Sequence, residues 1–192
     1  MPQCARWPID HRSPTRTLYP NSAWQTPFIG GSYEFLRKGA RLLDARSFFF
    51  FIATGITPAM ALQTPGAGSQ YAFAVRDAKG QPFDGRKTYR LHLPSNIPAK
   101  NFWSIVLYDT QTRSMLQTDQ QFPSVGSEKK GVVVNPDTSV DVYFGPKAPP
   151  GQESNWVQTW PGKGWMVILR LYGSEQAFFD KSWKPGEIEE VN

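Results

Sequence analysis

The stretch Thr88-Tyr89-Arg90-Leu91-His92-Leu93-Pro94 alternates apolar and polar side chains with a period of two residues. This is the period of a β-strand with one buried face, so Tyr89, Leu91 and Leu93 are expected to point inward. The proline that follows favours an end to the strand, because proline cannot donate a backbone hydrogen bond. The stretch therefore predicts a sheet with one packed face and one face in solvent.

Similar patterns continue on both sides, separated by turn residues. Residues 102–109 are apolar on both faces and are predicted to form a central strand. Further strands are expected at 71–75, 114–118, 132–134, 140–144, 155–160, 164–172 and 187–191, and a short helix near 175–181. Many short strands with frequent turns predict a mainly β protein, either an antiparallel sandwich or a barrel.

The residues before this region show a helical pattern and not a strand pattern. Residues 40–54 carry apolar side chains at helical spacing, and Gly55 and Pro58 favour an end to that helix. Phe48 and Phe51 lie off the main apolar face, so the helix is expected to make contacts on two sides. The predicted division is an irregular N-terminus at 1–18, a helical arm at 19–66 and a β domain at 67–192.

Composition excludes several classes of protein. The 192 residues include 13 Phe, 7 Trp, 7 Tyr, 16 Gly and 17 Pro, which argues against coiled coils and helical bundles. The net charge of +5 lies mostly within residues 1–65, so the nearly neutral β region gives no reason to expect a nucleic-acid partner. The most apolar run, 48–53, is too short to span a membrane.

Metal and export signals are also absent from the sequence. One cysteine and two histidines cannot form a disulfide within the chain, a cysteine-based zinc site or a three-histidine site, so no metal is expected. The sequence contains neither Gly-x-Gly-x-x-Gly nor a Walker pattern, and no cofactor is expected. No apolar signal segment is recognisable near the start. The chain as it stands is therefore expected in the cytoplasm, although its location is left open.

Polar and aromatic side chains in the strand region form the main candidate site. They are Tyr108, Arg113, Gln117, Tyr143, Asn155, Trp156, Gln158 and Trp160. Aromatic rings combined with amide and guanidinium donors suit a small polar or carbohydrate-like ligand. The same residue types are enriched at protein interfaces, so a partner domain is an equal alternative.

Two carboxylates are weak candidates for catalysis. Asp109 or Asp141 would act as a base and Arg113 would hold an anion, as in a hydrolase or lyase acting on a sugar or small organic acid. A structural interpretation is favoured for both. Asp109 begins a turn whose amides a carboxylate commonly caps, and Asp141 faces away from its apolar neighbours Val140 and Val142. Whether the protein is an enzyme is left open.

Several longer motifs resemble one family, the domain of unknown function 1214. The motifs lie, in order, at 101–109, 112–117, 139–146, 155–159, 161–173 and 183–188, and the resemblance covers about residues 67–190. Segments 31–35, 42–46 and 57–61 resemble the region before that domain in longer relatives. Thr138 departs from the Asp-Gly that the family's hairpin commonly has, which predicts a different turn.

The resemblance implies a jelly-roll-like β-sandwich and supplies no catalytic residues. Its relatives usually carry a partner, the domain of unknown function 1254, and often an export signal to the periplasm or outside. The chain therefore looks like the C-terminal half of a two-domain protein. A further hypothesis is a structural half-protein that needs a homodimer or partner domain through the helix at 42–56.

Overall fold

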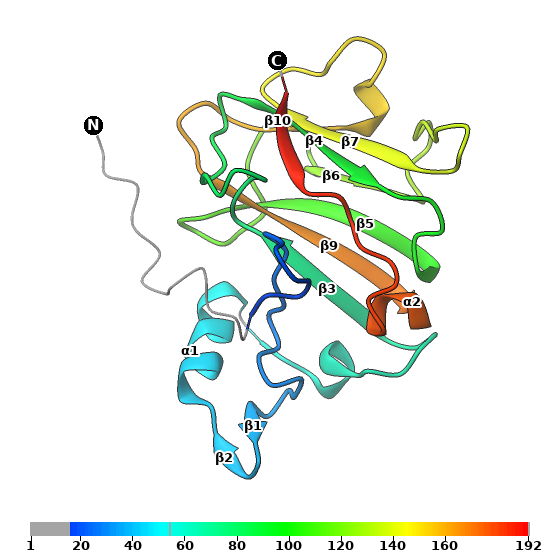
Figure 1. Cartoon of the computed structure of the whole chain (residues 1–192). Helices are drawn as coiled ribbons and strands as arrows, with labels where there is room; N and C mark the ends of the chain where they lie inside the picture. Colours follow the sequence, from blue (N-terminus) through cyan, green and yellow to red (C-terminus); the bar gives the residue numbers. More distant parts are fainter. Residues whose placement is uncertain (1–15, 54, 192) are drawn as a thin grey trace.

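Two four-stranded sheets face each other in the computed structural model, which describes residues 16–53 and 55–191 (Figure 1). One sheet has the order β10-β4-β7-β8 and the other β3-β9-β5-β6. Their bounds are β3 Ser69–Ala74, β4 Thr88–Leu93, β5 Ala99–Asp109, β6 Ser124–Gly126, β7 Val140–Gly145, β8 Trp156–Gln158, β9 Trp165–Ser174 and β10 Ile188–Val191. The prediction of a mainly β sandwich is confirmed.

Most strand pairs are antiparallel, as expected, but β8 runs parallel to β7. The parallel pairing arises because residues 146–155, including the 3₁₀ turn Glu153–Asn155, carry the chain back before β8 starts. A parallel pair needs such a crossover connection. The first sheet is therefore mixed, while the second is antiparallel throughout.

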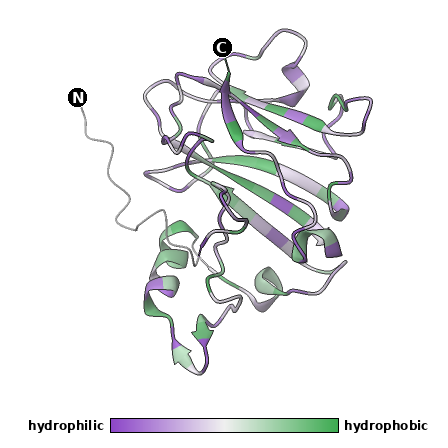
Figure 2. Ribbon diagram, in the orientation of Figure 1, coloured by the Kyte–Doolittle hydropathy of each residue, from purple (hydrophilic) through white to green (hydrophobic). Residues whose placement is uncertain are grey.

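The core lies between the sheets and follows the alternation of the sequence. Tyr89, Leu91 and Leu93 of β4 are all buried, as are the inward residues of β5 and β9. Phe83 stacks on Trp165 with ring centroids 4.1 Å apart, which joins the loop before β4 to β9. β5 lies between β9 and β6, so its predicted central position is correct. Figure 2 shows the resulting alternation of hydrophobic and hydrophilic residues along the strands.

The first residues of the arm pack on the sandwich as well. Trp24 is fully buried in the main core, and its indole N–H donates to the Gly186 carbonyl at 2.8 Å. Gln25 exchanges two backbone hydrogen bonds with Phe73, so it covers the free edge of β3. The predicted domain boundary at residue 66 stays a prediction, and the predicted irregular segment 1–18 falls largely outside the described residues.

The arm contains a small hairpin and one helix, which lie together beside the second sheet (Figure 1). The hairpin pairs β1 Leu36–Arg37 with β2 Ala40–Arg41, and the helix α1 is Leu43–Ile52. The helix starts later than predicted because residues 40 and 41 pair with the other hairpin strand. A 3₁₀ turn at Pro58–Ala61 and the short helix α2 at Gln176–Phe179 complete the helices.

The helix makes contacts on two sides, as the sequence predicts. Phe48 packs on Phe73 of the second sheet, while Phe49 contacts Phe28 and Phe35 on the arm. Figure 2 shows α1 largely in hydrophobic colours. Leu43 and Phe50 are apolar residues within the helix predicted at 40–54, yet their exposed fractions are 64% and 45%.

Two of the predicted strands are absent from the fold, and one strand of the fold was not predicted. Residues 114–118 and 132–134 form no strand, whereas β6 was not expected. The first segment follows a tight turn and makes only an isolated bridge between Tyr108 and Met115. Thr138 adopts a φ of 68°, so the turn keeps the left-handed backbone that glycine usually supplies.

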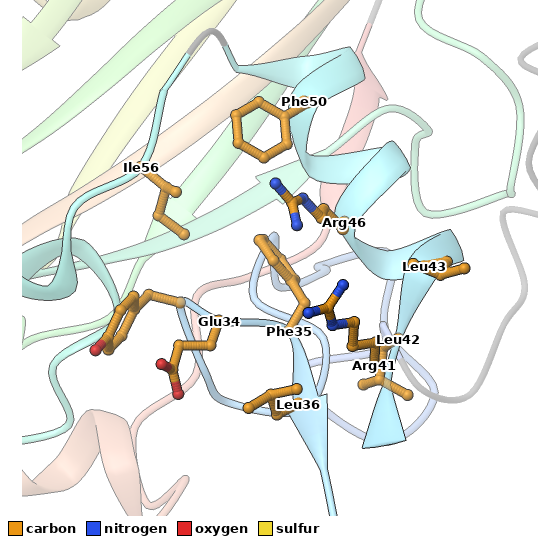
Figure 3. A pocket seen from close by; sticks show the side chains of 10 residues that line it. Glu34, Phe35, Leu36, Arg41, Leu42, Leu43, Arg46, Phe50 and Ile56 are labelled. Atoms are coloured by element: carbon orange, nitrogen blue, oxygen red, sulfur yellow. The ribbon is translucent and has the colours of Figure 1, made fainter. Parts of the chain in front are cut away.

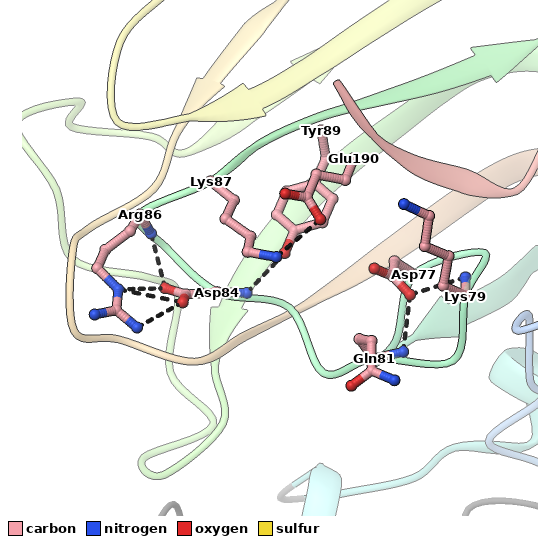
Figure 4. A network of polar contacts seen from close by, with 8 residues as sticks. All are labelled: Asp77, Lys79, Gln81, Asp84, Arg86, Lys87, Tyr89 and Glu190. Carbon is pink, nitrogen blue, oxygen red and sulfur yellow. Dashed lines mark hydrogen bonds and ion pairs between the residues drawn. The ribbon is translucent and has the colours of Figure 1, made fainter. Parts of the chain in front are cut away.

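The last strand is tied to the loop before β4 by polar contacts (Figure 4). Glu190 of β10 forms an ion pair of 2.8 Å with Lys87, and the backbone N–H of Asp84 donates to the Tyr89 hydroxyl at 3.0 Å. Burial raises the pKa of Tyr89, so its hydroxyl stays neutral and accepts this bond. The aspartate Asp77 caps the nearby turn by accepting from two backbone amides.

Candidate functional site

An open groove of about 390 Å³ lies where the β5 end meets the turn before β9. Its lining residues are Asp109, Thr112, Ser114, Met115, Gln117, Thr118, Asp119, Trp160 and Lys163. Hydroxyl, amide, carboxylate and ammonium groups share the groove with one large aromatic ring. The volume falls within the range of about 300–1,000 Å³ that is usual for small-molecule sites.

Asp109 is the last residue of β5 and closes the turn that follows. One carboxylate oxygen accepts from the amides of Gln111 and Thr112 at 2.6 and 3.1 Å, and the other contacts the Lys163 ammonium at 3.1 Å. Burial alone would raise the pKa of Asp109, but these three donors outweigh it and lower the pKa. A carboxylate held in this way is ionised and already bonded, which makes it a poor general base.

Trp160 forms the aromatic wall of the groove. It follows β8, and 45% of its surface is exposed. Gly85 lies directly against it, since a Cβ at this position would lie 2.0 Å from the Trp160 carbonyl oxygen. The Thr159 hydroxyl also donates to the Gly85 carbonyl at 2.9 Å. The backbone that carries the ring is therefore firmly held, while the ring itself faces solvent.

Gln158 supports another lining residue, Asp119. Its side-chain oxygen accepts from the Asp119 backbone N–H at 2.9 Å, and its amide donates to the Asp119 carboxylate at 3.0 Å. Its own backbone N–H donates to the Gln120 side chain at 2.8 Å. Gln158 is buried and positions Asp119, so it acts through that residue rather than on the groove surface.

Some of the predicted contacts are scattered. Asn155 is buried and bonds to backbone groups of Val133 and Asp141, while the Trp156 indole donates to the Gly145 carbonyl at 2.9 Å. Tyr143 pairs with Trp156 across β7 and β8. None of the three predicted residues is among those that line the groove.

Arg113 and Tyr108 also lie apart from the groove lining. The Arg113 guanidinium lies 4.6 Å from the Phe51 ring centroid and donates to the Gln111 carbonyl. The Tyr108 hydroxyl accepts a hydrogen bond from Arg170 on the outer face of the second sheet. Of the eight predicted ligand contacts, only Gln117 and Trp160 line the groove.

The two candidate catalytic carboxylates have separate partners. Asp141 contacts the His92 ring at 2.9 Å and accepts from the Asn135 amide at 3.0 Å, whereas Asp109 is held by its turn and Lys163. The prediction of an acid/base role for either residue therefore gains no support from this geometry.

Sequence reasoning missed several of the lining residues, namely Lys163, Thr112, Ser114, Met115 and Thr118. Lys163 follows Pro161-Gly162, a turn signal directly after Trp160, and this adjacency was the available clue. Among the described residues, no group of three acidic, histidine or cysteine side chains could hold a metal ion. Within the same part of the chain, every helix is too short or too polar to cross a bilayer.

Comparisons with known proteins show which solved structures the chain is similar to. A search of curated proteins finds no match. The VPA0106 protein from Vibrio parahaemolyticus is similar in structure, with a TM-score of 0.59 and 21% identity over 78% of this chain and 35% of that one. An uncharacterised protein from Burkholderia cenocepacia gives a TM-score of 0.43 and 20% identity, over 64% of this chain and 29% of that one. The chain thus spans about a third of the length of these solved structures.

A family model matches residues 68–176, from the start of β3 to the first turn of α2. This region holds both sheets except β10, together with the whole lining of the groove. The match covers more than half of the 192 residues. The chain therefore belongs to the family described as Protein of unknown function (DUF1214).

Proposed function

We propose that the protein is a β-sandwich module that binds a small carbohydrate-like ligand in the groove beside Trp160. The observation that carries this proposal is the exposed Trp160 ring next to the hydroxyl, amide and carboxylate groups of the groove. An exposed indole offers a flat apolar surface to the C–H face of a sugar ring, and the polar groups can bond to its hydroxyls.

The charges of the groove narrow the ligand class. Asp109 and Lys163 neutralise each other through their ion pair, so Asp119 leaves the groove with a net negative charge. Neutral sugars and amino sugars are therefore favoured over uronic acids and sugar phosphates, which would meet like charge.

A sugar panel tests this proposal. Calorimetric titration with neutral, amino and acidic monosaccharides and short oligosaccharides should give saturable binding for members of the first two groups. Trp160→Ala should weaken that binding about tenfold, because it removes the stacking surface. Phe122→Ala is the matched control, since Phe122 is an exposed aromatic outside the groove lining. Equal loss in both variants, or no saturable binding by any sugar, would refute the proposal.

A partner domain or homodimer through residues 42–56 is a second candidate. The exposure of Leu43 and Phe50 on α1 favours it, and so does the longer chain of the structural relatives. Light scattering measures the mass in solution, and a monomer at all concentrations would count against a homodimer. The alternative of a hydrolase or lyase rests on Asp109, Asp141 and Arg113, and the separate partners of these residues do not favour it.

A further inference from the structure

A second cavity lies on the arm, between the β1–β2 hairpin and α1 (Figure 3). It holds about 380 Å³, and its walls combine apolar side chains, among them Phe35, Leu36, Leu42, Phe50 and Ile56, with the charged side chains Arg41, Arg46 and Glu34. The family match begins at residue 68, so this cavity lies wholly outside it. It is also separate from the groove at the end of β5, with which it shares no lining residue.

Two guanidinium groups belong to the cavity lining. Figure 3 shows Arg46 and Arg41 with their guanidinium ends on either side of the Phe35 ring. Arg41 comes from β2 and Arg46 from the first turns of α1, so two separate elements supply the positive charges. Arg46 also lies 5.8 Å from the Phe50 ring centroid, which links it to the apolar wall.

Neither guanidinium has an acidic partner within the part of the chain that the structure describes. The ion pairs found there involve other residues, and none joins Arg41 or Arg46 to a carboxylate. Figure 3 shows the Glu34 carboxylate at the far side of the cavity, directed away from both. The two arginines and Glu34 together give the cavity a net charge of +1.

We infer that this cavity binds an organic monoanion, a carboxylate carried on an apolar body such as a medium-chain fatty acid or an aromatic acid. A guanidinium group suits a carboxylate because it can donate two parallel hydrogen bonds to the two oxygens, and Arg41 and Arg46 each supply one. The apolar walls would cover the body of such a ligand and exclude water from it. The net charge of +1 matches one negative charge, and Glu34 disfavours a dianion such as a phosphate monoester.

Octanoate is the probe that we would use, titrated into the full chain by calorimetry. Saturable binding of octanoate is expected, with octanol at least about tenfold weaker because it lacks the charge, and with no detectable binding of acetate. Replacing both arginines, Arg41→Gln with Arg46→Gln, should weaken octanoate binding at least about tenfold. Arg37→Gln removes one positive charge from the same hairpin as Arg41, outside the cavity lining, and should leave the affinity unchanged.

The substituted side chains are exposed, so the variants are expected to fold, and an unchanged thermal midpoint would confirm it. A Phe50→Ala variant tests the apolar wall independently and should also weaken octanoate binding. Three results would overturn the inference: no saturable binding of octanoate, equal affinity for octanol and octanoate, or an undiminished affinity in the double variant. Sugar binding at the Trp160 groove should be unaffected throughout, which separates this inference from the proposed function.

Discussion

Replacing Asn155 by alanine is expected to lower the free energy of unfolding by about 2–3 kcal/mol. The amide oxygen accepts from the Val133 backbone N–H at 2.8 Å. The amide nitrogen donates to the carbonyls of Val133 and Asp141 at 2.8 and 2.9 Å. The side chain thus ties the irregular segment at 132–134 to β7, where backbone pairing is absent.

The magnitude comes from these three bonds. Each contributes about 1 kcal/mol net, and the total is reduced because Val133 is partly exposed and water can replace some of the lost bonds. For a chain of this size, the expected loss corresponds to a fall in the thermal midpoint of about 4–12 °C.

Urea unfolding followed by tryptophan fluorescence measures the change. Asn101→Ala is the control, because Asn101 is an exposed asparagine on β5 and should change stability by less than about 0.5 kcal/mol. If Asn155→Ala is as stable as the unaltered protein but binds sugars more weakly, Asn155 would be a ligand contact and the structural reasoning would be wrong.

Three further substitutions test other parts of the structure. Thr138→Gly should raise stability by about 0.5–1 kcal/mol in urea unfolding, because glycine adopts the φ of 68° without the strain of a β-branched residue. A Gly85→Ala substitution should lower the free energy of unfolding by about 3 kcal/mol and weaken sugar binding, since its Cβ would lie 2.0 Å from the Trp160 carbonyl oxygen. A variant with unchanged stability and unchanged sugar affinity would contradict this. The lowered pKa of Asp109 means that its stabilising contribution is present above its unfolded pKa of about 3.9 and is lost as the pH falls through the lower folded value. Asp109→Asn should therefore be less stable than the unaltered protein at pH 7, with a difference that shrinks in urea titrations toward pH 3.

The strands that alternate or carry long apolar runs were predictable from the sequence. β4 has the predicted bounds, and β5 and β9 differ only at their ends, because burial imposes a period that local sequence records. β6 has only three residues and no such period, so its pairing with β5 depends on tertiary contacts. The parallel direction of β8 could not be predicted from the sequence either, since the direction of a strand depends on the path of the connection before it.

The candidate site was only partly predictable for a related reason. Trp160 and Gln117 stood out as an aromatic ring and an amide among strands. Asn155 and Gln158 have the same kind of side chain, but the fold uses them inside, bonded to backbone groups. Residue type alone cannot distinguish an amide that serves the fold from one that meets a ligand, because only the neighbours decide this.

The order of strands in the second sheet has a consequence for synthesis on the ribosome. β9 lies between β3 and β5, although almost a hundred residues separate it from β3 in the chain. Until β9 has emerged, β3 and β5 cannot occupy their final places, and each has an unpaired apolar edge. The second sheet can therefore be completed only after β9, which ends at Ser174, has been synthesised, and until then the apolar edges of β3 and β5 stay unpaired.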